Sequence, residues 1–153
     1  MNTGTAKKIL LILLALFLAA PAGLVAQDNG LPAGTDRVYS QEELDRLLAP
    51  LALYPDALLS QILMASTYPL EVADADQWVK GHPSLFGEKL NEALKDKPWD
   101  ASVKSLCNFP RVLSAMSENL EETASLGDAF LGQQDQVMYT IQNLRKKARE
   151  EGN

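Results

Sequence analysis

The feature that most constrains the fold is the stretch at residues 47–69, LLAPLALYPDALLSQILMASTYP. It is the longest apolar run outside the extreme N-terminus, and it contains three of the eight prolines. Because proline removes a backbone donor and clashes with the preceding helical turn, these prolines divide the run into short segments. The stretch therefore predicts two short helices and a turn against which the other segments pack.

Helix signals recur along the rest of the chain. Ser40 and Glu43 form a capping box ahead of leucines at three- and four-residue spacing. Asp100 and Ser84 are each expected to cap a helix. The aromatic–proline pairs at 54–55, 68–69 and 109–110 suit helix starts, where the missing proline N–H has no cost. The expected helices begin near residues 41, 55, 69, 85, 101, 110 and 122.

No segment alternates apolar and polar residues over the length of a strand, so the predicted class is all-α. We expect a compact orthogonal array of about six to seven helices. The apolar helix at 54–67 is expected at its centre, with a long C-terminal helix at about 122–149 packed across it. Gly127 and Gly132 each weaken that helix by about 1 kcal/mol relative to alanine, and a break near Gly132 is the alternative.

The N-terminus has the pattern of a cleavable secretory signal. Lys7 and Lys8 precede a twelve-residue apolar run at 9–20, which is too short to span a bilayer comfortably. Cleavage is expected after Ala26 or Ala22, and an uncleaved membrane anchor is the alternative. We predict a signal peptide at residues 1–26, a flexible linker at 27–39 and a single helical domain at 40–151. The expected location is the periplasm or the medium.

Charge and cysteine content restrict the function classes. Loss of Lys7 and Lys8 would leave 12 Lys and Arg against 20 Asp and Glu, a net charge of −8. Such a chain is repelled by phosphates, so no nucleic-acid partner is expected. Once the signal is cleaved, no stable membrane insertion is expected. Cys107 is the only cysteine, so no intramolecular disulfide forms, and its apolar neighbours predict burial.

A weak repeat relates two parts of the chain at an offset of fifty-five residues. In both copies a short helix leads to an aromatic–proline corner and then to a core helix. Duplication and two uses of one corner are equally good explanations. The aligned residues are Asp45, Leu48, Leu51, Tyr54, Pro55 and Leu58 with Asp100, Val103, Leu106, Phe109, Pro110 and Leu113.

A series of motifs keeps its order and spacing from residue 44 to residue 149. After the stretch LLAPLALYPDALLSQILMASTYPLEV come QW at 77–78, KPWD at 97–100, SVKSL at 102–106, FP at 109–110 and LGDAFL at 126–131. In these motifs the chain resembles the bacterial exported family known as domain of unknown function 3300. The resemblance implies an exported helical domain with no established activity. Members often carry a long low-complexity C-terminal tail, and we expect any function of that tail to be absent here.

Glu71, Asp74 and Trp78 share one face of a predicted helix. Two carboxylates beside an aromatic side chain could serve as an acid–base pair, as in glycoside hydrolysis. The alternative is that the acidic residues favour the positive end of the helix and that the tryptophan is half-buried. His82 is the sole histidine and has no partner at ligand spacing, so neither a metal site nor any cofactor is expected.

Two further groups are candidates for a partner or ligand surface. Arg145, Lys146, Lys147 and Arg149 form a basic cluster that could contact anionic lipid headgroups or an acidic partner, although cations also suit the end of a helix. Aromatic side chains at helix corners would bind a ligand if several lined one cleft, and would otherwise fasten helix ends to the core. The corner aromatics are Tyr54, Tyr68, Trp78, Trp99 and Phe109.

No catalytic constellation is found in the sequence. We therefore expect a non-catalytic binding or scaffold module of the cell envelope with a protein partner. The first alternative is a cell-wall or glycan hydrolase that uses Glu71 and Asp74. The second is a carrier of an apolar ligand, which requires a cavity inside the array.

Overall fold

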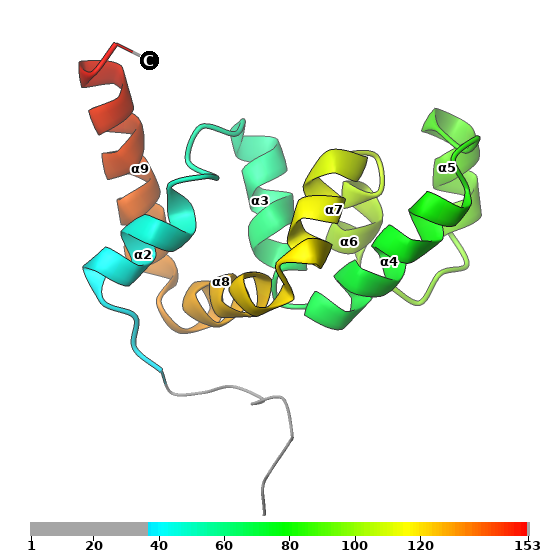
Figure 1. Ribbon diagram of the computed structural model, residues 1–153, viewed down its shortest axis with the longest axis horizontal. Coiled ribbons are helices and arrows are strands. Elements are labelled where there is room, and N and C mark those ends of the chain that lie inside the picture. The colour runs from blue at the N-terminus through cyan, green and yellow to red at the C-terminus, as the bar shows by residue number, and fades with distance from the viewer. Residues whose placement is uncertain (1–36, 153) are drawn as a thin grey trace, which may run out of the picture. The chain divides into compact units, whose positions relative to one another are not determined.

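The computed structural model describes residues 37–152, and every regular element among them is an α-helix (Figure 1). The all-α prediction is therefore confirmed. The predicted signal peptide and most of the predicted linker lie outside the described residues. The eight helices are α2 (Gln41–Leu48), α3 (Asp56–Ala65), α4 (Pro69–Gly81), α5 (Gly87–Leu94), α6 (Ala101–Leu106), α7 (Pro110–Glu118), α8 (Leu120–Gly132) and α9 (Gln134–Glu150).

The predicted C-terminal helix at 122–149 is two helices. The chain turns at Gln133, between α8 and α9, so the break falls beside Gly132 as the alternative prediction placed it. This break raises the helix count from the expected six or seven to eight within the described part of the chain. The terminal helix α9 still has 17 residues.

Two of the predicted caps are confirmed and one is wrong. Ser40 and Glu43 form a capping box at the start of α2, and Asp100 accepts the Ser102 N–H at 2.8 Å at the start of α6. Ser84 caps nothing: α5 begins at Gly87, and the residue before it, Phe86, makes no side-chain cap. Gly87 has φ +56°, a conformation that favours glycine, so the start of α5 depends on backbone freedom.

The aromatic–proline corners share one local turn. At each corner the aromatic N–H donates to the carbonyl three residues earlier, over 2.8–3.0 Å. Tyr68 and Phe109 have nearly the same backbone angles (φ −125°, ψ 57° and φ −123°, ψ 65°), and the next proline is the first helical residue. Neither residue has helical backbone angles, in keeping with the steric clash that disfavours the α region before proline, so the pair ends one helix and starts another.

The central helix is α8, not the apolar helix α3 that the sequence indicated. α8 packs against α2, α3, α4, α7 and α9, whereas α3 packs mainly against α6 and α8. The last helix, α9, lies on α2 and α8 (Figure 1). Gly127 explains why α8 reaches this position, since a Cβ there would lie 2.3 Å from the Ser66 carbonyl oxygen. Only glycine allows the two backbones to come this close.

Buried residues from every helix form one apolar core. The packed part of the chain starts at Tyr39, one residue before the predicted domain boundary. Tyr39 is 4% exposed, and its N–H and carbonyl both bond to the Gln133 side chain, at 2.6 and 3.0 Å. Within the described helices, no segment is both long and apolar enough to cross a bilayer.

Candidate functional site

An apolar groove of about 260 Å³ lies where the end of α2 and the turn after it meet α3, α7 and α8. Its floor is made by core side chains such as Ile62, and polar groups of Arg46, Asn119 and Glu122 stand among its lining residues. The apolar lining residues are Leu47, Pro50, Leu51, Tyr54, Ile62, Val112, Ala115, Met116 and Leu126. An apolar floor with polar groups at its edge is typical of a binding surface.

The groove owes its shape to the proline-divided stretch. α2 ends at Leu48, and the residues around Pro50 form successive turns before α3 begins at Asp56. This detour keeps Leu47, Leu51 and Tyr54 only half-buried against the core. On the opposite wall, buried Thr123 of α8 donates to the Met116 carbonyl of α7 at 2.8 Å and fixes the two helices.

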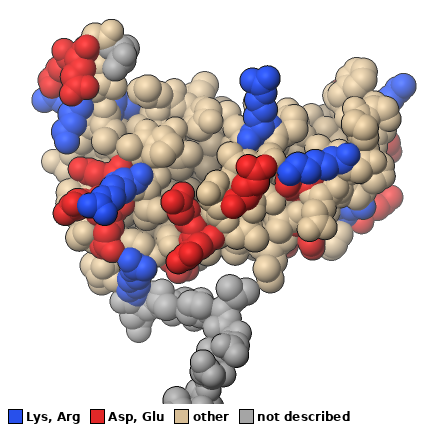
Figure 2. Space-filling model, in the orientation of Figure 1, with Lys and Arg blue, Asp and Glu red and all other residues tan. Residues whose placement is uncertain are grey.

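Positively and negatively charged side chains are mixed on the surface of the domain. On the face that Figure 2 shows, Lys and Arg side chains lie among Asp and Glu side chains, and neither sign forms a broad area. At the groove itself, the exposed Arg46 pairs with Glu42 one turn earlier on α2, at 2.6 Å. The groove therefore presents an apolar surface next to locally paired charges, and not next to a broad area of one sign.

A second candidate site, the Trp78 cluster, consists of Trp78, His82, Lys97 and Trp99. The indole rings of Trp78 and Trp99 stand edge to face, with centroids 6.1 Å apart and planes at 72°. The Lys97 ammonium lies 4.6 Å from the Trp78 centroid and 5.5 Å from that of Trp99. The His82 ring stacks on Trp78 at 4.3 Å, and its Nδ1 bonds to the Trp78 carbonyl at 2.7 Å.

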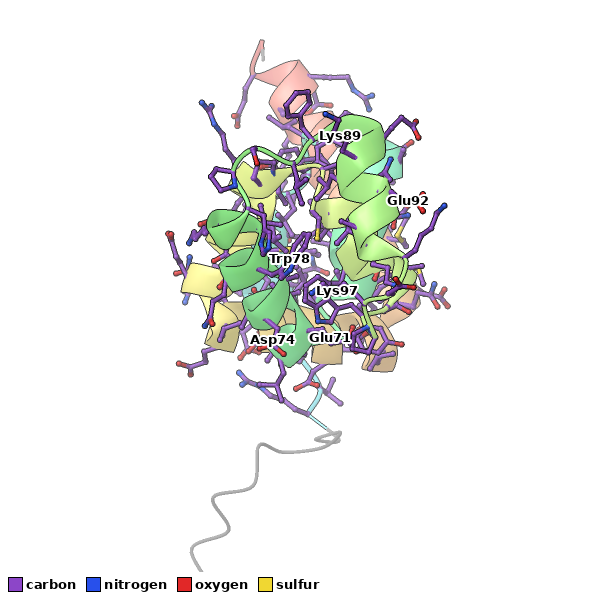
Figure 3. The ribbon with its side chains drawn as sticks, turned by 90° about the vertical axis from the view of Figure 1, so that its right-hand side faces the viewer. Glu71, Asp74, Trp78, Lys89, Glu92 and Lys97 are labelled. Carbon is purple, nitrogen blue, oxygen red and sulfur yellow. The ribbon has the colours of Figure 1, made fainter. Side chains whose placement is uncertain are left out.

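The predicted carboxylates both lie on α4 next to this cluster (Figure 3). Glu71 is half-buried, and its Oε2 accepts the Asp100 backbone N–H at 2.6 Å. Glu71 therefore joins α4 to the start of α6, directly after Trp99. Asp74 is exposed on the same helix face. The structure thus brings Glu71, Trp78 and Trp99 together, with Asp74 at the solvent side.

The predicted basic cluster is divided by the structure. The Arg145 guanidinium donates to the carbonyls of Ala52 and Tyr54, at 2.6 and 2.9 Å, and to Asp56 at 2.5 Å. Its side chain is only 19% exposed, so Arg145 fastens α9 to the turn before α3. Lys146 and Lys147 are exposed, and Lys146 lies 3.8 Å from Glu150. The cationic surface at this end consists of these two lysines and Arg149.

Cys107 is buried at 1% exposure and is a free thiol, as its apolar neighbours predicted. Burial raises the pKa of the Cys107 thiol to about 11, so its nucleophilic thiolate is suppressed near neutral pH. Across residues 37–152, no three His, Cys, Asp or Glu side chains are grouped so that they could hold a metal ion.

Three features of the structure are not evident from the sequence. Lys97 was not singled out, because a lysine in a turn between helices carries no periodic signal. Val112, Met116 and Leu126 line the groove, and nothing local in the sequence shows that they do. Asp76 is 4% exposed and pairs with Lys80 at 2.8 Å, and its position on the apolar side of α4 was the available signal.

Comparison with known proteins gives a family but no activity. A family model described as "Protein of unknown function (DUF3300)" matches residues 40–153. The uncharacterized protein YacH of Escherichia coli (strain K12) is 50% identical over 121 residues, which cover 79% of this chain and 20% of YacH. The chain therefore spans about a fifth of the length of this curated relative. No solved structure matches the chain.

Proposed function

This chain belongs to the protein family of unknown function DUF3300, and we propose that its helical domain is an exported, non-catalytic binding module of the bacterial cell envelope. The groove between α2, α3, α7 and α8 is the site that binds. Its occupant is a set of apolar side chains from an envelope protein partner.

The observation that carries this proposal is the half-exposed apolar surface of the groove. Leu47, Leu51 and Tyr54 line the groove and remain partly in contact with solvent. Exposed apolar surface with a polar edge supports a binding role, because removing such surface from water favours association. The groove volume of about 260 Å³ lies just below the roughly 300–1,000 Å³ of small-molecule sites, which favours a few side chains over a whole ligand.

The test is crosslinking of the native protein in the periplasmic fraction, with two variants that add the same charge. Ala115 is an exposed residue of α7 that lines the groove, so Ala115→Arg fills it with a charged side chain. Ala57 is an exposed alanine of α3 that does not line the groove, so Ala57→Arg is the matched control.

We expect a crosslinked partner with the unmodified protein and with Ala57→Arg, and at least a tenfold weaker band with Ala115→Arg. Absence of a crosslinked partner, or a band that Ala115→Arg leaves unchanged, would contradict the proposal. Thermal unfolding of both variants checks that the groove substitution has not unfolded the domain.

Export is tested separately by fractionation and N-terminal sequencing. The proposal expects the protein in the periplasm or medium, beginning at Gly23 or Gln27 after removal of the signal. Protein that stays in the membrane fraction with Met1 intact would support the uncleaved anchor instead.

The second candidate, a carrier of an apolar ligand, would use the same apolar groove, although this is a surface groove and not the cavity inside the helix array that the hypothesis requires. Organic extraction of the purified native protein, followed by mass spectrometry, separates the two candidates. A stoichiometric apolar compound that is lost in Ala115→Arg would favour the carrier.

A glycan hydrolase that uses Glu71 and Asp74 remains the third candidate. The neighbouring indole faces support it, because sugars stack on tryptophan, whereas the bond from Asp100 to Glu71 gives that carboxylate a structural use. Replacement of both carboxylates by the matching amides should abolish any cell-wall hydrolysis that the native protein shows. Hydrolysis that survives the double replacement would remove this candidate.

A further inference from the structure

The Trp78 cluster has the geometry of an aromatic site for a cation. Two indole rings at 72° form the two walls of a corner, and an ammonium group lies within about 6 Å of both ring centroids. Within the described residues, no carboxylate lies within ion-pair distance of the Lys97 ammonium. The ring faces are therefore the principal partners of this charge.

Lys97 reaches the corner from a turn and not from the helix that carries Trp78. It lies between α5 and α6, and both indole rings and Lys97 itself are partly exposed. In Figure 3 the Lys97 side chain lies beside Trp78, with Glu71 and Asp74 toward the start of the same helix. The resident cation is thus at the surface, where a cation from solution can compete with it.

Negative charge next to the corner favours a cation over a neutral guest. Glu71 accepts a bond from the Asp100 N–H, and Asp100 follows the Trp99 wall directly. Asp74 is exposed one turn of α4 before Trp78. Carboxylates beside an aromatic wall raise the local concentration of cations and do not repel them as a basic surface would.

We propose that the corner between Trp78 and Trp99 is a binding site for an alkylammonium group, and that Lys97 is its internal occupant. An external alkylammonium binds by displacing the Lys97 ammonium from the two ring faces. This site is separate from the groove and does not depend on the proposed binding module.

Tryptophan fluorescence reports this site directly, because Trp78 and Trp99 are the only two tryptophans of the chain. The probe is choline, and the control is 3,3-dimethylbutan-1-ol, which has the same shape without the charge. N-acetyl-lysine amide is a second probe, because the same ammonium chemistry could come from a small quaternary cation or from a lysine of a partner protein.

We expect a saturable fluorescence change with choline or with the lysine amide, and none with the neutral alcohol. The probe that binds more tightly shows whether the site suits a small quaternary cation or a lysine of a partner protein. Lys97→Ala removes the internal competitor and should lower the dissociation constant roughly fivefold. Lys89→Ala changes another exposed lysine, on α5, and should leave it unchanged.

The contrary explanation is that Lys97 only fastens the segment around α5 to α4. In that case Lys97→Ala lowers the unfolding temperature and neither ammonium probe gives a saturable change in either protein. That result overturns the proposal, as does equal binding of choline and its neutral analogue. Trp99→Leu keeps apolar volume without an indole face, and it must abolish binding if the corner is the site.

Discussion

Gly127 shows how one residue decides the packing of two helices. The atoms that a Cβ at this position would meet are backbone atoms, Ser66 O at 2.3 Å, Ser66 C at 2.7 Å and Thr67 N at 2.9 Å. No side-chain rotation relieves such contacts, so α8 would have to move away from the end of α3.

We expect Gly127→Ala to lower the free energy of unfolding by about 3 kcal/mol, because α8 must shift against its neighbours. Gly132→Ala is the control, since a Cβ there meets nothing within 4 Å. Its expected effect is neutral or stabilising by about 0.5–1 kcal/mol. Urea unfolding followed by circular dichroism measures both. If the two substitutions change the free energy of unfolding equally, the close approach to Ser66 does not determine the cost of a Cβ at residue 127.

Glu43 makes the start of α2 sensitive to acid. The Ser40 backbone N–H and then the Arg37 guanidinium stabilise its carboxylate and lower the pKa of Glu43 to about 2. A lowered pKa in the folded state adds stability above the unfolded pKa of about 4.3, and this stability is lost as the pH falls toward 2.

Glu43→Gln keeps the capping hydrogen bonds and removes the charge. The stability difference between the native protein and this variant is therefore expected to be constant from pH 7 to pH 5 and to shrink between pH 4 and pH 2. Urea midpoints at each pH give the comparison. A difference that stays constant down to pH 3 would contradict the role of the Glu43 charge.

At the scale of elements, helix starts that depend on neighbouring residues were predicted well. Contacts between segments far apart in the sequence were not. Ser40, Asp100 and the prolines act on the turn beside them, so their helix starts could be read from neighbours in sequence. The cap predicted at Ser84 is wrong because the helix begins three residues later, at Gly87. Arg145 looked like one of several terminal cations, since the carbonyls that it contacts lie about ninety residues away.

The element-scale prediction concerns the attachment of α9. Arg145→Met leaves the Ala52 and Tyr54 carbonyls without their donor, and should cost about 2 kcal/mol of unfolding free energy. Lys147→Met is the matched control on the exposed side of α9 and should change stability by less than about 0.5 kcal/mol. Hydrogen exchange should show faster opening of α9 in the Arg145 variant alone.

The two copies of the repeat at an offset of fifty-five residues share local structure but differ in packing. The corners at Tyr54 and Phe109 share the same turn hydrogen bond. However, Pro55 occupies the position before its helix, whereas Pro110 is the first residue within its helix. The turns after α2 are longer than the turn after α6, and this extra length opens the groove.

For the molecule as a whole, Cys107 provides a test of cooperative unfolding. Its sulfur is buried and its raised pKa suppresses the thiolate, so a disulfide reagent at pH 8 should leave the native protein unlabelled. Labelling should appear over the same urea range as the loss of helical circular dichroism. Labelling at clearly lower urea would mean that the segment around α6 opens before the rest of the domain.

The sequence indicated the class, most helix starts and the burial of Cys107, but not which helix is central. Apolar density pointed to α3, because seven of its ten side chains are apolar. The central helix is instead α8, whose small residues Gly127 and Ala129 are buried among its neighbours. The candidate sites were partly predicted: Trp78, Trp99 and Glu71 meet, whereas Lys97 and the far wall of the groove come from tertiary packing.

The central position of α8 also bears on the order in which the chain can fold. Ribosomes release the N-terminal helices first, yet α8 begins only at residue 120, so α2, α3, α4 and α7 are made before the partner that they share. These helices complete their packing only once α8 has been made. Completion of the native core thus depends on a single helix that is made after most of its partners.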